Sequence, residues 1–185
     1  MRLFIASTFP EAILGSLHER LQRLKPRLPR ASWVRTESQH LTFAFLGEQD
    51  EATAARVATE VEPRLQKMQT FQAMLHGCGF FPNRRHARIG WCAVDPQVRF
   101  TEIAESVREA VRSAGVAFDE NEFRPHLTLM RIRDYWPPLA IDTFEKELRD
   151  YRSEPFPVSS VTLYVSRLDP KGAVHTPLRQ FALAA

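Results

Sequence analysis

One short pattern, a histidine and a threonine two residues apart in an apolar segment, occurs twice in this chain. The first copy is His40-Leu41-Thr42-Phe43, and the second, 86 residues later, is His126-Leu127-Thr128-Leu129. Because side chains alternate between the two faces of a β-strand, each copy places its histidine and threonine on one face and its apolar residues on the other. We therefore predict two strands that each bury one face and present a His–Thr pair to a cleft.

The hydrophobic periodicity elsewhere predicts helices and strands that do not alternate regularly. Apolar residues at helical spacing predict helices over residues 13–24 and 52–65 and a third that Pro96 opens and Gly115 ends. Short apolar segments bounded by turn residues predict strands. These strands are 3–8, 32–35, 40–46, 70–81, 87–94, 125–130, 160–165 and 178–183. Hairpins dominate this order, which favours an α+β fold with antiparallel sheets over a doubly wound sheet.

Two connections carry turn residues, and one long segment has no clear period. Pro82-Asn83-Arg84-Arg85 joins two predicted strands, and Asp169-Pro170-Lys171-Gly172 joins the last two. Residues 134–156 are proline-containing and weakly periodic. We predict mostly loop in this segment, with a short helix at 142–150.

The composition is that of an ordinary globular protein with a mild preference for anionic partners. The chain has 185 residues, of which 44% are hydrophobic, and its net charge is +3. The N-terminal apolar segment is too short for a signal core or a membrane span. Cys78 and Cys92 are expected to be buried thiols in a reducing compartment. We therefore expect a cytoplasmic location and no membrane partner.

The two His–Thr pairs suit acid–base cleavage of a phosphodiester. A neutral imidazole can take a proton from water while a protonated one supplies a proton to the leaving oxygen, and both forms are accessible near neutral pH. The threonine hydroxyls of Thr42 and Thr128 can hold the non-bridging oxygens. The sequence has no metal-binding histidine cluster, no G-x-S-x-G and no P-loop. We therefore expect no metal and no cofactor.

Through the two His–Thr segments, the sequence resembles the 2H phosphoesterases with their HxTx motifs. Within them it is similar to the bacterial and archaeal RNA 2′,3′-cyclic phosphodiesterases, also called 2′-5′ RNA ligases. The similarity covers nearly the whole chain. It is carried by RLFIA at 2–6, WV at 33–34, HLTFAFLGE at 40–48, RPHLTLMR at 124–131, VTLY at 161–164 and TPL at 176–178.

The resemblance implies a fold, a reaction and roles for individual residues. It implies one domain over residues 1–185, made of two lobes that are related by a pseudo-twofold axis, each with an antiparallel sheet facing a central cleft. It implies hydrolysis of RNA 2′,3′-cyclic phosphate ends to 2′-phosphates. His40 would be the proton donor and His126 the proton acceptor, and Thr42 and Thr128 would bind the phosphate. The residues by themselves do not rank the two histidines as acid and base.

The resemblance also implies that Arg131 binds the phosphate, although its spacing from His126 is odd. In an ideal strand, a residue five positions after His126 points away from the cleft. A bulge after Leu129 could redirect it. Without a bulge, Arg131 would be a solvated charge.

Several other residues keep two interpretations. Arg84, Arg85 and Arg88 could grip RNA with Phe80 or Phe81 stacking on a base, or they could form a solvated loop, which we favour slightly. Trp33 and Arg35 could line the rim of the cleft or have no such role. His175-Thr176 is not counted as a third motif, because adjacent side chains in a strand face opposite sides.

Three other functions compete with cyclic phosphate hydrolysis. The same residues could join a cyclic end to a 5′-hydroxyl through a 2′-5′ bond without ATP. A relative of the same fold could act on 2′-5′ oligonucleotides or small cyclic nucleotides. A non-catalytic module could hold a nucleotide or an RNA end, although both histidines and both threonines are present. The expected partners are RNA with 2′,3′-cyclic phosphate ends or small cyclic nucleotides, and the expected oligomeric state is a monomer.

Overall fold

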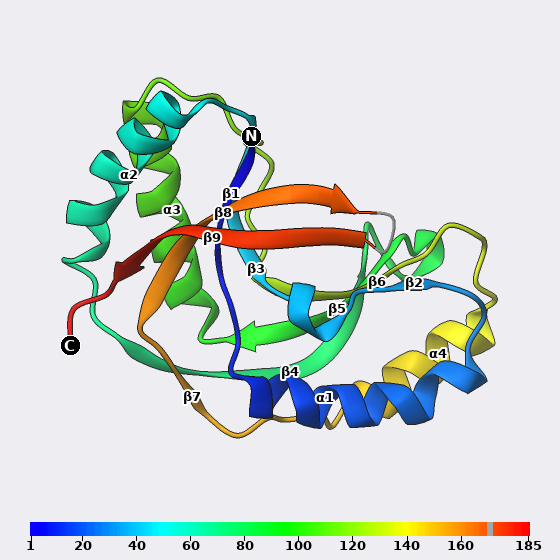
Figure 1. Ribbon diagram of the computed structural model, residues 1–185. Coiled ribbons are helices and arrows are strands. Elements are labelled where there is room, and N and C mark those ends of the chain that lie inside the picture. The colour runs from blue at the N-terminus through cyan, green and yellow to red at the C-terminus, as the bar shows by residue number, and fades with distance from the viewer. Residues whose placement is uncertain (170–171) are drawn as a thin grey trace.

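In the computed structural model, which describes residues 1–169 and 172–185, four α-helices flank two antiparallel sheets (Figure 1). The helices are α1 (Glu11–Leu24), α2 (Glu51–Leu65), α3 (Gln97–Ser113) and α4 (Pro138–Leu148). The strands are β1 (Arg2–Ser7), β2 (Ser32–Trp33), β3 (Leu41–Glu48), β4 (Phe71–Phe81), β5 (Ile89–Asp95), β6 (His126–Arg131), β7 (Phe156–Val158), β8 (Ser160–Asp169) and β9 (Gly172–Ala182). The predicted α+β class with antiparallel sheets is confirmed.

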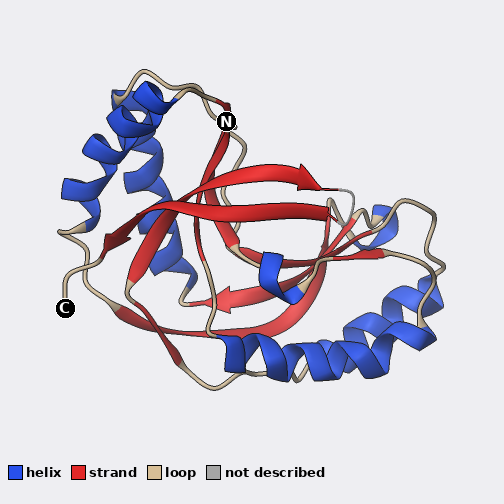
Figure 2. Cartoon of the chain, in the orientation of Figure 1, coloured by secondary structure: helices blue, strands red, loops and turns tan. Residues whose placement is uncertain are grey.

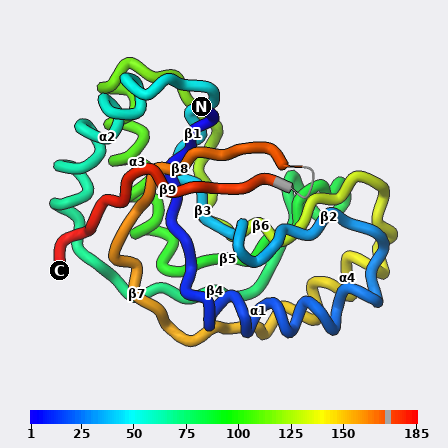
Figure 3. The backbone as a smooth tube through the Cα atoms, viewed as in Figure 1, coloured from blue at the N-terminus to red at the C-terminus, as the bar shows by residue number. Residues whose placement is uncertain are grey.

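The two motif strands belong to different sheets. The first sheet has the order β3-β1-β8-β9, so β1 lies between the first motif strand and a strand from the end of the chain (Figure 3). The second sheet has the order β2-β6-β5-β4-β7, with the second motif strand β6 between β2 and β5. Each His–Thr pair is therefore held by strands that are distant from it in sequence.

The helices cover the apolar faces of these sheets. Figure 2 shows α2 and α3 side by side on one side of the molecule and α1 and α4 along another. In α2 the apolar stripe Val57, Val61 and Leu65 is fully buried, and the Asp50 side chain caps the helix by accepting from the Thr53 N–H at 2.7 Å. The buried apolar residues of both sheets and all four helices form one continuous core.

The prediction for residues 134–156 is partly wrong. Helix α4 begins at Pro138 rather than at residue 142 and ends at Leu148. Proline suits the first helical position because its missing N–H needs no partner there. Buried Ile141, Phe144 and Leu148 then follow at helical spacing. None of the described helices is both long enough and apolar enough to cross a bilayer.

The two closing strands are longer than predicted. Strand β9 begins at Gly172 rather than at residue 178, and it pairs with β8 from Asp169 down to Ser160. The sequence prediction missed the first half of β9 because its residues are largely polar or small. Pro170 and Lys171 of the predicted turn lie outside the described residues.

Candidate active site

The structure brings the two His–Thr pairs to one cleft between the two sheets. The cleft has a volume of about 480 Å³, and His40, Thr42, His126 and Thr128 all line it. In β3, Thr42 is exposed while Leu41 and Phe43 on either side are buried. In β6, Thr128 is half-buried between fully buried Leu127 and Leu129. The alternation predicted from the repeated pattern is therefore present in both strands.

The two histidines have the same hydrogen bond on the same ring nitrogen. Nδ1 of His40 lies 2.8 Å from the carbonyl oxygen of Ser38, and Nδ1 of His126 lies 2.6 Å from that of Arg124. Both partners are two residues upstream of the histidine. Because a carbonyl can only accept, each Nδ1 must carry the hydrogen. Nε2 of each ring is therefore left to accept a proton when the ring is neutral and to donate one when it is charged.

Burial makes both imidazoles harder to protonate in the free protein. It lowers the pKa of His40 from its usual 6.5 to about 4, against the opposing effect of the hydrogen bond to the Ser38 carbonyl. The charges of His175, Arg131 and His126 add to this decrease. All three groups line the same cleft as His40.

The pKa of His126 is also lowered, again by burial first. The hydrogen bond to the Arg124 carbonyl acts in the opposite direction. The ring of Phe81 packs edge-on against that of His126, with centroids 4.9 Å apart, and contributes to this apolar environment. A neutral His126 with a free Nε2 is the form that can accept a proton from water.

A bulge in β6 turns Arg131 toward the cleft. The pairing of β5 with β6 shifts between Trp91 and Gly90, which lie opposite Thr128 and Met130. Leu129 is thus an extra residue in β6, and its carbonyl accepts instead from Val34 N–H at 2.9 Å. Arg131 lies beyond the bulge and lines the cleft with both histidines.

The cleft is positively charged. The described residues that line it include three arginines, Arg2, Arg35 and Arg131, and no aspartate or glutamate. Trp33 also lines it, with the Lys25 ammonium 5.0 Å from its ring centroid. The structure therefore places Trp33 and Arg35 in the cleft lining, where the sequence left both interpretations open. Such a cleft attracts anions.

His175 is a cleft residue that the sequence analysis set aside. Its ring lies 5.0 Å from that of His40 and 4.9 Å from that of Phe4, centroid to centroid, in edge-to-face contacts. Thr176 does not join it, since Thr176 is not among the described residues that line the cleft. The position of His175 depends on its pairing with Ser166 in the β8–β9 hairpin, and no local sequence pattern predicts that pairing.

Arg108 on α3 links the segments that carry the two motifs. Its Nε donates to the carbonyl of Phe43 at 3.0 Å, and its Nη1 donates to the carbonyl of Asn121 at 2.9 Å. Phe43 follows the first His–Thr pair, and Asn121 lies in the segment that leads to His126. The guanidinium also lies over the ring of Phe123, 5.5 Å from its centroid. We infer that Arg108 fixes the spacing between the two motifs.

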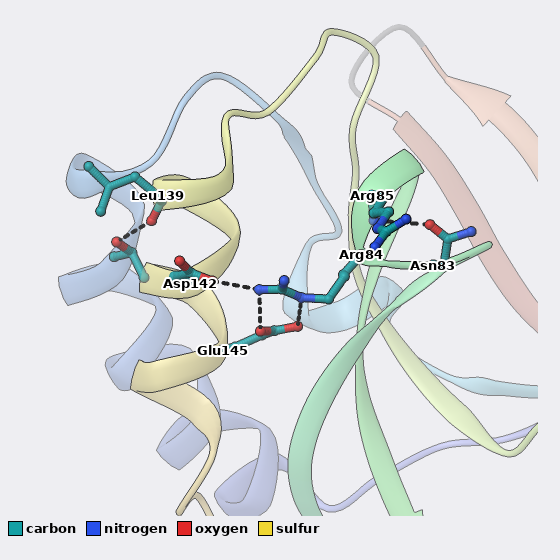
Figure 4. A network of polar contacts seen from close by, with 7 residues as sticks. Asn83, Arg84, Arg85, Leu139, Asp142 and Glu145 are labelled. Carbon is teal, nitrogen blue, oxygen red and sulfur yellow. Dashed lines mark hydrogen bonds and ion pairs between the residues drawn. The ribbon is translucent and has the colours of Figure 1, made fainter.

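Of the two interpretations of Arg84, a grip on RNA does not fit its contacts. Its guanidinium pairs with Asp142 at 2.5 Å and with Glu145 at 3.2 Å, both on α4 (Figure 4). Phe80 is buried against Phe144, with ring centroids 5.0 Å apart, so it cannot stack on a base. Arg84 and Phe80 are therefore structural, as the second interpretation held.

With this geometry established, the chain can be compared with known proteins. Residues 11–170 match the family model described as the 2′-5′ RNA ligase superfamily. The chain belongs to this superfamily. It is 31% identical over 180 residues to the RNA 2′,3′-cyclic phosphodiesterase of Thermotoga maritima, a match that covers 96% of this chain and 93% of the relative. It is 33% identical over 189 residues to the protein of the same name from Archaeoglobus fulgidus, covering 98% and 99%.

Solved structures share the architecture of this chain. The crystal structure of TT0787 from Thermus thermophilus superposes with a TM-score of 0.79 at 28% identity, covering 99% of this chain and 98% of that one. Escherichia coli LigT in complex with 3′-AMP superposes with a TM-score of 0.75 at 24% identity, covering 100% and 98%. The predicted membership and the fold are thus confirmed over the full chain.

Proposed function

We propose that this superfamily member hydrolyses 2′,3′-cyclic phosphate ends of RNA to 2′-phosphates. The observation that carries the proposal is the pair of imidazoles in one arginine-lined cleft, each with Nδ1 bound to a backbone carbonyl. Relatives that match nearly the whole chain are named RNA 2′,3′-cyclic phosphodiesterases, which supports the substrate. The complex of Escherichia coli LigT with 3′-AMP supports a nucleotide ligand.

In the proposed reaction, the two histidines move one proton each. The neutral Nε2 of His126 takes a proton from water, and the water oxygen forms a bond to phosphorus. The bond from phosphorus to the 3′ oxygen breaks as the protonated Nε2 of His40 gives its proton to that oxygen. The product is a 2′-phosphate with a free 3′-hydroxyl. At the end of the cycle His126 is protonated and His40 is neutral, so water restores the starting state by proton exchange.

Three further side chains would hold the phosphate in line. We assign the hydroxyls of Thr42 and Thr128 and the guanidinium of Arg131 to its non-bridging oxygens. The two threonines lie one on each sheet, so they can contact the phosphate from opposite sides. Negative charge increases on these oxygens as water attacks. The same donors would therefore bind the transition state more strongly than the substrate.

The pH dependence of the reaction should report the two buried imidazoles. We expect kcat/KM to be bell-shaped with both limbs at or below pH 6.5, because burial lowers both pKa values in the free enzyme. The profile of kcat should lie at higher pH, since the bound phosphate anion favours the protonated form of His40 and offsets the charge of Arg131. Initial rates with a cyclic mononucleotide across the imidazole range measure both profiles. Identical, flat profiles with chemistry rate-limiting would contradict the mechanism.

The experiment that tests the proposed function uses an RNA oligomer ending in a 2′,3′-cyclic phosphate, with EDTA present. We expect the wild type to convert it to a 2′-phosphate in the chelator, because no step of the mechanism requires a metal. Separation of the 2′- and 3′-phosphate products identifies the bond that breaks. Exclusive formation of the 3′-phosphate, or activity only after metal is restored, would refute the proposal. Tight binding of the RNA end without turnover would instead identify a binding module.

The family description favours one second activity, 2′-5′ ligation. It is the same displacement at the same phosphorus, with a 5′-hydroxyl taking the place of water, so that the 5′ oxygen forms a bond to phosphorus as the bond to the 3′ oxygen breaks. His126 would take the proton of the 5′-hydroxyl and His40 would give its proton to the 3′ oxygen, as in hydrolysis. Adding a 5′-hydroxyl RNA to the assay measures the ratio of ligated to hydrolysed product, and we expect hydrolysis to dominate because water is the more abundant nucleophile.

Other expectations stay predictions. Both cysteines are free thiols, and burial raises the pKa of Cys78 to about 12 and that of Cys92 further. Thiols kept protonated in this way are poor nucleophiles, which supports a structural role. The cytoplasmic location stays a prediction. The monomeric state and the single domain of two lobes over residues 1–185 also stay predictions.

A further inference from the structure

A second hollow, of about 360 Å³, lies beyond the end of β6, next to the segment that joins β4 to β5. We call it the arginine basin. Its polar and aromatic lining consists of Arg85, His86, Arg88, Arg133, Asp134 and Tyr135, with Trp136 buried beside them. None of the proposed catalytic steps uses these residues.

The arginine basin combines positive charge with an exposed aromatic ring. Arg85, Arg88 and Arg133 are all exposed, and Asp134 is the one acidic residue among the described lining residues. Tyr135 is 74% exposed, which leaves its ring open to a stacking partner. Arginines that contact phosphates next to a ring that stacks on a base are the combination that single-stranded nucleic acids require.

Arg84, next to Arg85 in the segment that joins β4 to β5, differs from the arginines of the basin in its contacts. Arg84 is bound by Asp142 and Glu145 of α4, whereas Arg85 contacts the Asn83 side chain through its backbone N–H and not through its guanidinium (Figure 4). Arg88 uses Nη1 to donate to the carbonyl of Arg133 at 2.7 Å. That bond holds the two residues together. Within the described part of the chain, it leaves the other donors of the Arg88 guanidinium and the whole Arg133 guanidinium available to a ligand.

The basin continues the catalytic cleft along one strand. Arg131 lines the cleft, Ile132 is buried and binds the carbonyl of Arg88 through its N–H, and Arg133 lines the basin. Arg131 and Arg133 therefore lie on the same face of an extended segment. At a rise of about 3.3 Å per residue, Arg133 lies roughly 23 Å from His126 along the chain.

We propose that the arginine basin binds the RNA chain upstream of its cyclic end. Since the cyclic phosphate terminates the 3′ end, the rest of the RNA must leave the cleft, and the basin offers a charged path for it. The guanidinium groups of Arg85, Arg88 and Arg133 would contact backbone phosphates, and Tyr135 would stack on a base. The inference rests on the proposed function and extends it, because it makes RNA oligomers better substrates than cyclic mononucleotides.

The test compares substrates of increasing length, from a 2′,3′-cyclic mononucleotide to oligomers of about eight nucleotides. We expect KM of the wild type to fall with length and then to level off once the RNA reaches the basin. The variants are the double substitution Arg85→Ala with Arg133→Ala, and Tyr135→Ala. Arg56→Ala is the matched control, because Arg56 is an exposed arginine on α2, far from the basin (Figure 1).

For the longest oligomer, the double variant should raise KM about tenfold and leave kcat unchanged, since the lost contacts are equal in ground and transition states. It should also reduce the slope of log(kcat/KM) against log salt by about 1.4, or 0.7 for each phosphate contact. Tyr135→Ala should raise KM about fivefold or more. With the mononucleotide, all variants should match the wild type.

Equal effects of the variants on mononucleotide and oligomer, or no effect on either, would overturn the inference. Failure of the proposed function gives a different result, since the wild type would then be inactive on the mononucleotide as well. In that case, binding of an oligomer that already carries a 2′-phosphate, followed by fluorescence anisotropy, still decides whether the basin holds RNA. Loss of affinity in the double variant supports the inference, and unchanged affinity overturns it.

Discussion

Replacing His40 or His126 by asparagine is expected to lower kcat for cyclic phosphate hydrolysis at least about a hundredfold, the usual contribution of one general acid or base. Asparagine is the sharper substitution than alanine here. Its amide N–H can still donate to the carbonyl that accepts from Nδ1, Ser38 in one motif and Arg124 in the other. The variant therefore keeps the local backbone contact and loses only the nitrogen that carries the proton.

Single-turnover hydrolysis of a 2′,3′-cyclic mononucleotide measures this loss without interference from product release. His76→Asn is the matched control, because His76 is on β4 and does not line the cleft. The double variant of His40 and His126 should be little worse than either single variant, since the two histidines act as a unit. A single variant that retains more than about a tenth of wild-type kcat would remove that residue from the acid–base pair.

Phe43→Ala is expected to destabilise the protein by about 3–5 kcal/mol, a large part of the total stability of a domain. Phe43 is fully buried on the face of β3 opposite to Thr42, and its ring stacks on Phe123 with centroids 5.9 Å apart. Truncation leaves a cavity beneath the first motif strand. Equilibrium unfolding in urea measures the change in the free energy of unfolding.

The two faces of β3 allow an internal control. Phe43→Leu should cost less than about 1.5 kcal/mol, because it retains much of the buried volume. Thr42→Ala should leave stability almost unchanged, since Thr42 is exposed, and should lower activity instead. If Phe43→Ala and Thr42→Ala changed stability equally, the assignment of one buried and one functional face would be wrong.

Local patterns in the sequence were sufficient to predict the motif strands and the residues they expose. The alternation of apolar residues around Thr42 and Thr128 determined which side chains face the cleft, and the helical spacing of Val57, Val61 and Leu65 determined α2. These features depend on residues close together in the chain, where periodicity is informative. The same reasoning placed the start of α4 too late, because the hydrophobic periodicity after Pro138 is weak.

Contacts between distant segments could not be predicted in this way. His175 reaches the cleft only because β9 pairs with β8, and β8 with β1, so that its ring meets that of Phe4. Arg108 is an ordinary helix residue in the sequence, yet its guanidinium joins the carbonyls of Phe43 and Asn121. Such positions depend on strand order and tertiary packing, which a single sequence does not encode in any short window.

The extra residue in β6 shifts the phase of the strand. Before Leu129, even-numbered residues such as His126 and Thr128 face the cleft, and after it odd-numbered ones, Arg131 and Arg133, take over. With the bulge kept, an insertion or deletion of one residue elsewhere between His126 and Arg131 would point one of these groups into the core, whereas loss of the extra residue itself would restore ordinary alternation at an even spacing. Homologous enzymes that keep both groups and the bulge should therefore preserve an odd spacing here, and a designer who moves this spacing to another scaffold must move the bulge with it.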